Sequence, residues 1–526
     1  MKNDRDRKFY KQHTIFRRPK DFCPDRRQFL RYCGLLGETA LMASLFNPLD
    51  GFGNTEKPLH FVIVGAGLAG LCAAYELEKR GHTCIVLEAE PTHIGGRVRT
   101  LRFEDNLYGE AGAMRIPLCH NLTRHYIDEF ALETRRFIHA NPNAYYCLRG
   151  HRERIKNVKN LYPLYALKTS EKSKTLNALW NEALTGQFKG LSNREKADLH
   201  SDDLETCAVR RIDHRSLRQT FQQAGISAEA IELIGATFAV QSLLSSATSE
   251  FLREELDGVG VEGYLEIVGG TDRLPMAFAQ CLRSKPRLGC EVVRLEQNSA
   301  DRTATAVYKE QGKYYRVTGD FVLCTLPFPV LKRIPVTPPF TFEKQRAIEA
   351  LHYESSTKIL AITRSRFWER EDRIFGGASY TDLPTAMTFY PSDNITQNPH
   401  VSDRPAVLLA SYTWGEQARY LGRMPHAQRA GATIEILQQI HPQLGKPGML
   451  RHTASWNWDT HQWNQGAFAW FMPGQHTGLH RHVMASEGRI FFAGEHCSLA
   501  HSWMQGALES ALRAIREMIE VSRLTR

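Results

Sequence analysis

The sequence predicts an α/β (α+β) protein whose first parallel sheet is assembled from segments far apart in the chain. Three observations support this prediction: an apolar run over 59–64 that leads into glycines, a second run over 83–87, and a third over 489–493. Short apolar runs bounded by turn residues are typical of buried strands. Because a chain of 526 residues exceeds one hydrophobic core, we expect other units to be inserted between these strands.

The first run ends in a glycine turn, Gly65-Ala-Gly-Leu-Ala-Gly70, that opens a helix. Gly65 allows the tight turn, Gly67 lets backbone N–H groups approach a pyrophosphate, and Gly70 lets the helix pack closely on the strand. The second run ends in Glu88, an acid at the spacing where a carboxylate can accept hydrogen bonds from ribose hydroxyls. The sequence therefore predicts a Rossmann-like dinucleotide-binding domain.

The rest of the chain divides by its patterns. We expect a tail over 1–57, the discontinuous nucleotide-binding domain over 58–120, 258–335 and 480–526, a largely helical insert over 121–257, and a substrate-binding domain over 336–479. Further strands are predicted at 290–295, 304–310, 314–318, 321–325, 357–363 and 406–412, and helices at 428–440 and about 502–522.

Composition excludes several classes of protein. The net charge is +10, but residues 1–31 alone carry eleven Lys and Arg against four Asp, so the body is only slightly basic. We therefore expect no nucleic-acid partner. The eleven cysteines form no CxxC pair, so neither a disulfide framework nor a metal site is expected.

The tail contains Asp25-Arg26-Arg27-Gln-Phe-Leu, which resembles a twin-arginine export signal, followed by a mostly apolar stretch over 32–46. Glu38 interrupts that stretch, and no clean cleavage site precedes Gly53. The hypothesis is an exported, periplasmic protein; the alternative is a retained amphipathic helix on a cytoplasmic protein. No run reaches the roughly 18–20 apolar residues of a membrane span.

A second pair of glycines follows Glu88 in Gly95-Gly96-Arg97, where close approach to a pyrophosphate and a compensating charge are again combined. With the first turn and the segment 491–496, it resembles the FAD-binding segments of the flavin amine oxidase family. Segments 112–117, 266–270 and 355–358 look like the L-amino-acid oxidase branch. The resemblance covers nearly everything from residue 59 onward and is weakest over 121–255.

This resemblance implies an FAD-binding domain with a substrate-binding domain and a helical unit inserted into it. It implies FAD contacts from Gly65, Gly67, Ala69, Gly70, Glu88, Gly96, Arg97, Met114, Arg115, Val292, Glu495 and Met504.

The resemblance also implies a substrate site. Arg115 matches the arginine that binds a substrate carboxylate, a pairing suited to a guanidinium fork; the alternative is an arginine paired with Glu110. Lys358 matches a lysine that holds a water near the flavin; the alternative is a strand-end lysine that reaches solvent. Trp503 matches a catalytic aromatic residue that flanks the substrate amine in front of the flavin, Tyr390 matches a pocket wall that helps to hold the carboxylate, and Phe468 matches an apolar contact with the substrate side chain. The family often has glycine before the tryptophan, where this chain has Ser502.

The function implied is FAD-dependent oxidation of an L-amino acid by O2 to the 2-oxo acid, ammonia and hydrogen peroxide. Alternatives are an amine or polyamine oxidase, an amino-acid 2-monooxygenase of the same fold, and a flavin-binding protein without turnover. The family often forms homodimers, and we expect one here. No strong base is evident, and Glu254 and Glu255 are expected on a solvated helix face; the alternative is a contact with a basic substrate side chain.

Overall fold

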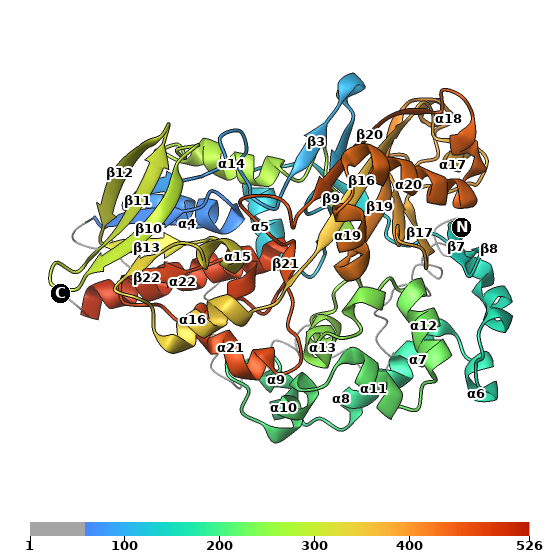
Figure 1. Cartoon of the computed structure of the whole chain (residues 1–526), viewed down its shortest axis with the longest axis horizontal. Coiled ribbons are helices and arrows are strands. Elements are labelled where there is room, and N and C mark those ends of the chain that lie inside the picture. Colours follow the sequence, from blue (N-terminus) through green and yellow to red (C-terminus); the bar gives the residue numbers. More distant parts are fainter. Residues whose placement is uncertain (1–57, 525–526) are drawn as a thin grey trace.

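A four-stranded parallel sheet forms the centre of one part of this computed structural model, which describes residues 58–524 (Figure 1). The strand order is β2 (Thr83–Leu87), β1 (His60–Val64), β13 (Phe321–Cys324) and β22 (Ile490–Phe492). The three apolar runs that predicted the sheet thus lie in it together, with the run over 321–325 between the first and the last.

Both faces of this sheet are buried. Phe61 and Ile63 pack against α4 (Leu68–Lys79), α14 (Arg273–Cys281) and α22 (Met504–Leu524). Val62 and Val64 face the other way and pack against an antiparallel sheet. Burial on both faces explains why these strands are continuous apolar runs instead of alternating ones.

The covering antiparallel sheet consists of β12 (Lys313–Gly319), β11 (Thr303–Glu310) and β10 (Glu291–Asn298), with β14 (Val336–Thr337) parallel to β10. Helices α15 (Phe328–Leu331), α16 (Phe342–Ala350) and α21 (Gln475–Met484) complete this side. In Figure 1 these elements lie to the left, around the parallel sheet.

A seven-stranded sheet forms a second body, to the upper right in Figure 1. Its order is β20 (Leu450–Asn457), β16 (Ser356–Thr363), β19 (Ala406–Trp414), β18 (Met387–Tyr390), β17 (Gly377–Thr381), β7 (Tyr145–Leu148) and β8 (His151–Arg154). Its accompanying helices are α17 (Phe367–Arg370), α18 (Pro399–Ser402), α19 (Gly415–Gly422) and α20 (His426–Ile440).

Residues 121–257, expected to be largely helical, contribute strands as well. Strand β6 (Thr134–Phe137) joins β9 (Tyr264–Ile267) and β5 (Ile116–Pro117) in a three-stranded sheet, while β7 and β8 extend the seven-stranded sheet. Neither β6 (Thr-Arg-Arg-Phe) nor β8 (His-Arg-Glu-Arg) contains an apolar run, because most of their residues are partly or fully accessible to solvent. Their pairing depends on distant partners, so the local pattern did not predict them.

Helices make up much of the remainder of this range, and all of them after the first lie in the lower part of the molecule in Figure 1. Their bounds are α5 (Asn121–Glu129), α6 (Thr169–Lys172), α7 (Leu176–Ala183), α8 (Gly186–Lys189), α9 (Asn193–Asp198), α10 (Cys207–Asp213), α11 (Leu217–Gln223), α12 (Ala228–Thr237) and α13 (Thr248–Asp257). Two further sheets have two strands each: β3 (Thr100–Arg102) pairs with β4 (Tyr108–Glu110), and β15 (Tyr353–Glu354) pairs with β21 (Phe468–Ala469).

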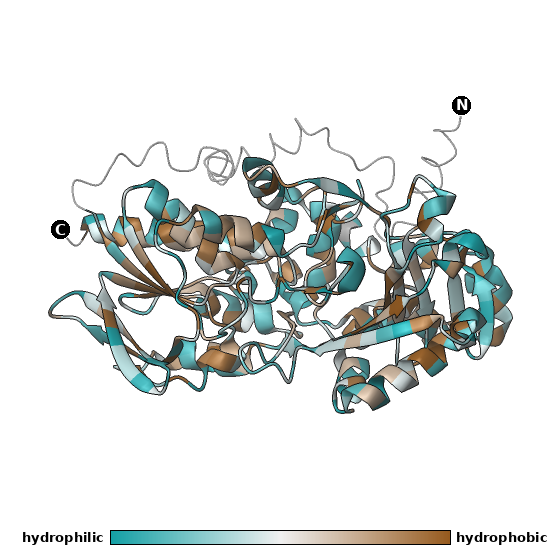
Figure 2. Cartoon of the chain, turned by 90° about the horizontal axis from the view of Figure 1, so that it is seen from above, coloured by the Kyte–Doolittle hydropathy of each residue, from teal (hydrophilic) through white to brown (hydrophobic). Residues whose placement is uncertain are grey.

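Hydrophobic residues concentrate on the inner strands, whereas the outer helices carry many hydrophilic residues (Figure 2). Within 58–524, no helix has both the length and the apolar character needed to cross a membrane. The twin-arginine segment lies outside the described residues.

Candidate active site

A long cavity runs along the carboxyl ends of the parallel strands, the edge where α/β sheets bind ligands. Val64, Leu87 and Thr325, at or just after the ends of β1, β2 and β13, all line it. The N-termini of α4 and α22 also face it, through Gly67 and Met504. A helix N-terminus presents free N–H groups and a positive dipole end, so this edge suits a ligand that carries negative charge.

Two positions of the first turn require glycine for different geometric reasons. A Cβ on Gly70 would lie 2.1 Å from the carbonyl oxygen of Gly65, so the helix can approach the strand only without a side chain there. A Cβ on Gly67 would meet nothing within 4 Å, and Gly67 lines the cavity. Gly70 is therefore a packing residue that does not line the cavity, while Gly67 leaves open space for a ligand.

Glu88 holds the glycine turn in place. Its Oε2 accepts a hydrogen bond from the Ala66 N–H at 2.7 Å, and its Oε1 accepts one from the Glu90 N–H at 2.8 Å. Burial raises the pKa of Glu88, and these backbone hydrogen bonds oppose that shift. The carboxylate thus fixes the turn and still lines the cavity.

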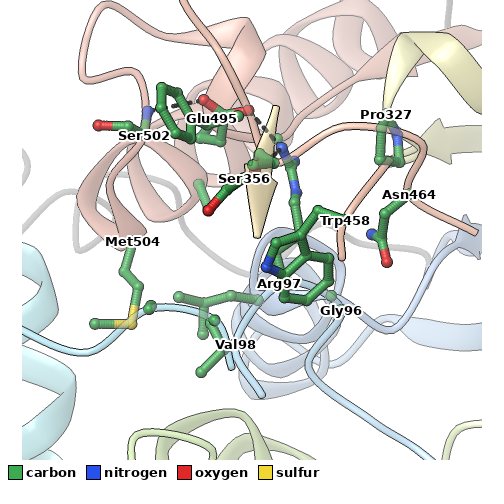
Figure 3. A pocket seen from close by; sticks show the side chains of 18 of the residues that line it. Gly96, Arg97, Val98, Pro327, Ser356, Trp458, Asn464, Glu495, Ser502 and Met504 are labelled. Atoms are coloured by element: carbon green, nitrogen blue, oxygen red, sulfur yellow. Dashed lines mark hydrogen bonds and ion pairs between the residues drawn. The ribbon is translucent and has the colours of Figure 1, made fainter. Parts of the chain in front are cut away.

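Glu495 joins three segments across the cavity, as Figure 3 shows for Arg97 and Ser502. Its Oε1 accepts from Arg97 Nη1 at 2.7 Å and from the Ala469 N–H at 3.0 Å. Its Oε2 accepts from the Ser502 N–H at 3.0 Å. One carboxylate therefore fixes the second glycine segment, β21 and the loop that leads into α22.

Ser502 stands where the family resemblance implies a glycine, and its backbone conformation is one that favours glycine. Its φ is +65°, in the left-handed region where residues other than glycine are disfavoured. The turn places Trp503 and Met504 against the cavity.

Lys358 lies inside β16 with its side chain 2 % exposed, so the alternative of a lysine reaching solvent is wrong. Its Nζ donates to the Gly112 carbonyl oxygen at 2.6 Å and lies 4.4 Å from the ring centre of Tyr412. Burial lowers the pKa of Lys358 to about 7, an effect that Glu110 opposes and Arg115 reinforces.

Arg115 lies among aromatic rings at the end of the cavity that Lys358 also lines. Its guanidinium carbon is 5.6 Å from the ring centres of Tyr264 and Trp503 and 5.9 Å from that of Phe389. Among residues 58–524 it forms no ion pair, and its buried Nε has no hydrogen-bond partner. Glu110, the alternative partner, instead accepts hydrogen bonds from Thr100 and from the Thr271 N–H.

Tyr390 does not take the predicted position in the pocket wall. Its hydroxyl is within 2.7 Å of Ser379 Oγ and 2.5 Å of His441 Nε2, and it packs on Trp368 on the far side of the seven-stranded sheet. Successive residues of a strand point to opposite faces, and on β18 it is Met387 that lines the cavity.

Glu254 corrects the expectation of a solvated helix face. It lines the cavity, and its Oε1 accepts a hydrogen bond from Trp503 Nε1 at 2.8 Å. Its neighbour Glu255 does not reach the cavity; it is buried and accepts from Trp180 Nε1 at 3.1 Å. Sequence reasoning also missed several aromatic or imidazole side chains in the cavity wall, among them His139, Tyr264, Tyr380, Tyr412 and Trp414.

The structure brings most of the predicted site residues to this one cavity. They are Gly65, Gly67, Ala69, Glu88, Gly96, Arg97, Met114, Arg115, Val292, Lys358, Phe468, Glu495, Trp503 and Met504. Gly70 and Tyr390 lie outside its wall.

Comparison with known proteins shows which family the chain is similar to. The model of the flavin containing amine oxidoreductases matches residues 68–519. The chain is 33% identical over 475 residues to the putative L-amino-acid oxidase YobN of Bacillus subtilis (strain 168), covering 89% of this chain and 96% of that protein. It is 33% identical over 469 residues to the L-amino-acid oxidase of Siganus canaliculatus, covering 88% and 86%.

Solved structures show the same fold. Putrescine oxidase bound to putrescine superposes with a TM-score of 0.71 at 19% identity, over 88% of this chain and 99% of that one. Cyclohexylamine oxidase from Brevibacterium oxydans IH-35A gives 0.69 at 18%, over 89% and 100%.

The chain belongs to the flavin containing amine oxidoreductase family. It is a flavin-dependent oxidoreductase, and its cofactor is FAD.

The cavity fits that cofactor. Its wall extends from Val292 and Glu88, past the open space at Gly67, to Lys358 and Trp503. An elongated dinucleotide needs such a continuous path, with uncapped helix N-termini beside its phosphates. Both α4 and α22 present N-termini to it, and Gly67 at the start of α4 has no side chain to cap the helix.

Proposed function

We propose that this enzyme oxidises the α-amino group of an L-amino acid, with release of the 2-oxo acid, ammonia and hydrogen peroxide. The observation that carries the proposal is Arg115, a cavity-facing arginine with no ion-pair partner among the described residues. A guanidinium in such a place calls for an anionic partner. An amino acid brings a carboxylate for bidentate pairing, whereas a simple amine does not.

The remaining residues take their proposed roles around that contact. Arg115 holds the substrate carboxylate, Trp503 and Phe468 flank the substrate, and Lys358 acts at the flavin end of the cavity. The bound FAD supplies the two-electron acceptor and the subsequent reaction with O2. The protein contributes orientation and exclusion of water. The aromatic wall, including Tyr380, Tyr412 and Trp414, favours an apolar or aromatic substrate side chain.

The test compares each amino acid with its decarboxylated amine. We expect L-phenylalanine, added without oxygen, to bleach the bound flavin, and 2-phenylethylamine to do so poorly. Replacing Arg115 by Ala removes a bidentate charged pair, so KM for amino acids should rise about 100-fold or more, with little change for amines. Arg124→Ala, an exposed arginine on α5, is the matched control. Unchanged amino-acid kinetics in Arg115→Ala would reject the carboxylate contact.

Two same-fold alternatives are separated by their products and substrates. An amine or polyamine oxidase would turn over the amine as fast as the amino acid. An amino-acid 2-monooxygenase would release an amide in place of stoichiometric peroxide. Equal yields of peroxide and 2-oxo acid support the oxidase.

We also propose a homodimer and export, on narrower grounds. The homodimer rests on the family resemblance, and light scattering of the purified protein tests it: a mass of one chain would reject it. Export rests on Arg26-Arg27. A reporter fused to residues 1–57 should reach the periplasm, and Arg26→Lys with Arg27→Lys should retain it in the cytoplasm.

A further inference from the structure

One carboxylate in the cavity wall has no role in the scheme above. Glu254 lies on α13 and lines the same cavity as Arg115. Trp503 contacts both groups: its Nε1 donates to Glu254 at 2.8 Å, and its ring centre is 5.6 Å from the Arg115 guanidinium carbon. The charge of Arg115 also acts on Glu254 across the cavity, so a substrate held by its carboxylate at Arg115 would lie in the cavity that the Glu254 side chain lines.

Glu254 also borders a second cavity. This cavity of about 20 Å³ lies against Glu254 and Trp503, and its volume is above the roughly 10–15 Å³ that a cavity needs to hold one water. Its wall is rich in titratable groups: His120, Glu250, Arg253, Asp257 and His501. A carboxyl group at this position can exchange its proton with this second cavity and the titratable groups that line it.

The surroundings of Glu254 set its ionisation. The charged or titratable groups that face it are Glu250 and Asp257 on its own helix, Arg115 and Tyr264 across the cavity, and Cys119 and His120 beside α5. Burial raises the pKa of Glu254 to about 7, the Trp503 hydrogen bond and Arg115 oppose this, and Glu250 and Asp257 reinforce it. A base works best when its pKa lies near the operating pH.

We propose that the Glu254 carboxylate is the base that takes a proton from the α-ammonium group of the substrate before oxidation. This inference rests on the proposed function. The N–H bond breaks, its electron pair remains on nitrogen as the lone pair, and an O–H bond forms on Glu254. No oxidation occurs in this step; it delivers a neutral amine, whose lone pair assists loss of hydride from the α-carbon.

The first experiment measures anaerobic flavin reduction by L-phenylalanine against pH. In wild type, we expect the ratio of the limiting rate to the dissociation constant to be level from about pH 7.5 to 9.5. Glu254→Gln must select free amine from solution, so its ratio should fall about tenfold per pH unit below the pKa of the substrate ammonium. Wild type and variant should converge near about pH 10.

Two variants serve as controls. Glu254→Asp keeps a carboxylate and should retain the level profile at a reduced rate. Glu255→Gln changes the adjacent glutamate, which lines neither cavity, and should leave the profile unchanged. Flavin content and thermal midpoint of each variant show that the fold is intact.

The second experiment needs no turnover. An α-methyl amino acid lacks the α-hydrogen, so it binds without being oxidised, and its dissociation constant is read from the flavin spectrum. We expect a level pH dependence in wild type and Glu255→Gln, and weakening by about tenfold per pH unit towards low pH in Glu254→Gln.

Two results would overturn the proposal. One is a Glu254→Gln profile parallel to wild type, which makes Glu254 structural. The other is a loss confined to lysine and arginine as substrates, which makes it a side-chain contact. Failure of the proposed function is distinct, since then no amino acid reduces the wild-type flavin.

Discussion

Replacing Glu495 by Gln tests whether one carboxylate holds the cofactor cavity together. Its Oε1 accepts from Arg97 and the Ala469 N–H, and its Oε2 accepts from the Ser502 N–H. The amide can keep its oxygen toward the first pair, but its NH₂ then faces the Ser502 N–H, donor against donor. An unsatisfied buried donor costs about 1–3 kcal/mol, and weakening a charged hydrogen bond to a neutral one costs about 1 kcal/mol.

These two costs sum to about 2–4 kcal/mol. Because Arg97 and the Ser502 N–H are both only partly buried, we expect local destabilisation in the lower part of that range, about 2–3 kcal/mol. A multidomain chain need not unfold in one step, so the assay is hydrogen exchange of the apoprotein in peptides that contain residues 467–469 and 500–504. Exchange should accelerate about 30- to 160-fold there. Glu520→Gln, exposed on the same α22, is the control. Acceleration below about threefold, or equal acceleration throughout the chain, would refute the reasoning.

Three other predictions follow from the geometry. Gly70→Ala should destabilise the fold by about 3 kcal/mol, since its Cβ would collide with the Gly65 carbonyl oxygen. Gly67→Ala should fold normally but bind FAD at least about tenfold more weakly. Equal unfolding midpoints for the two variants would contradict this distinction. Ser502→Gly should raise the thermal midpoint, by relief of about 1 kcal/mol at φ +65°, and Ser502→Ala should not. The Lys358 pKa of about 7 lies below its ordinary value of 10.5. Between these two pH values the unfolded chain binds more protons than the folded one, so Lys358 makes the free energy of unfolding rise with pH. Lys358→Met should flatten that rise, and an unchanged slope in apoprotein unfolding measured from about pH 7 to 10 would contradict the prediction.

The sequence predicted those parts of the site whose signals are local. The strand, glycine turn and helix over 60–79 are contiguous, and their burial on both faces leaves a clear apolar run. Glu254 could not be located this way, because a run of Arg-Glu-Glu looks like a solvated face until α13 packs beneath Trp503.

The prediction that Tyr390 lies in the pocket wall was wrong for a different reason. A strand exposes alternate residues to each face, so an error of one position exchanges the cavity for the opposite face. Only the pairing of β18 with β17 and β19 fixes that choice, and these partners lie outside any short window of sequence.

The order of the parallel sheet has a consequence for biosynthesis. Strand β13 pairs with β1 on one side and with β22 on the other, and β22 leaves the ribosome more than 160 residues later. Until then, β13 has an unpaired edge, and Arg97 lacks its carboxylate partner, Glu495. Such open edges invite wrong pairing, so the nascent chain depends on a late closing step, and cofactor capture belongs to the end of synthesis.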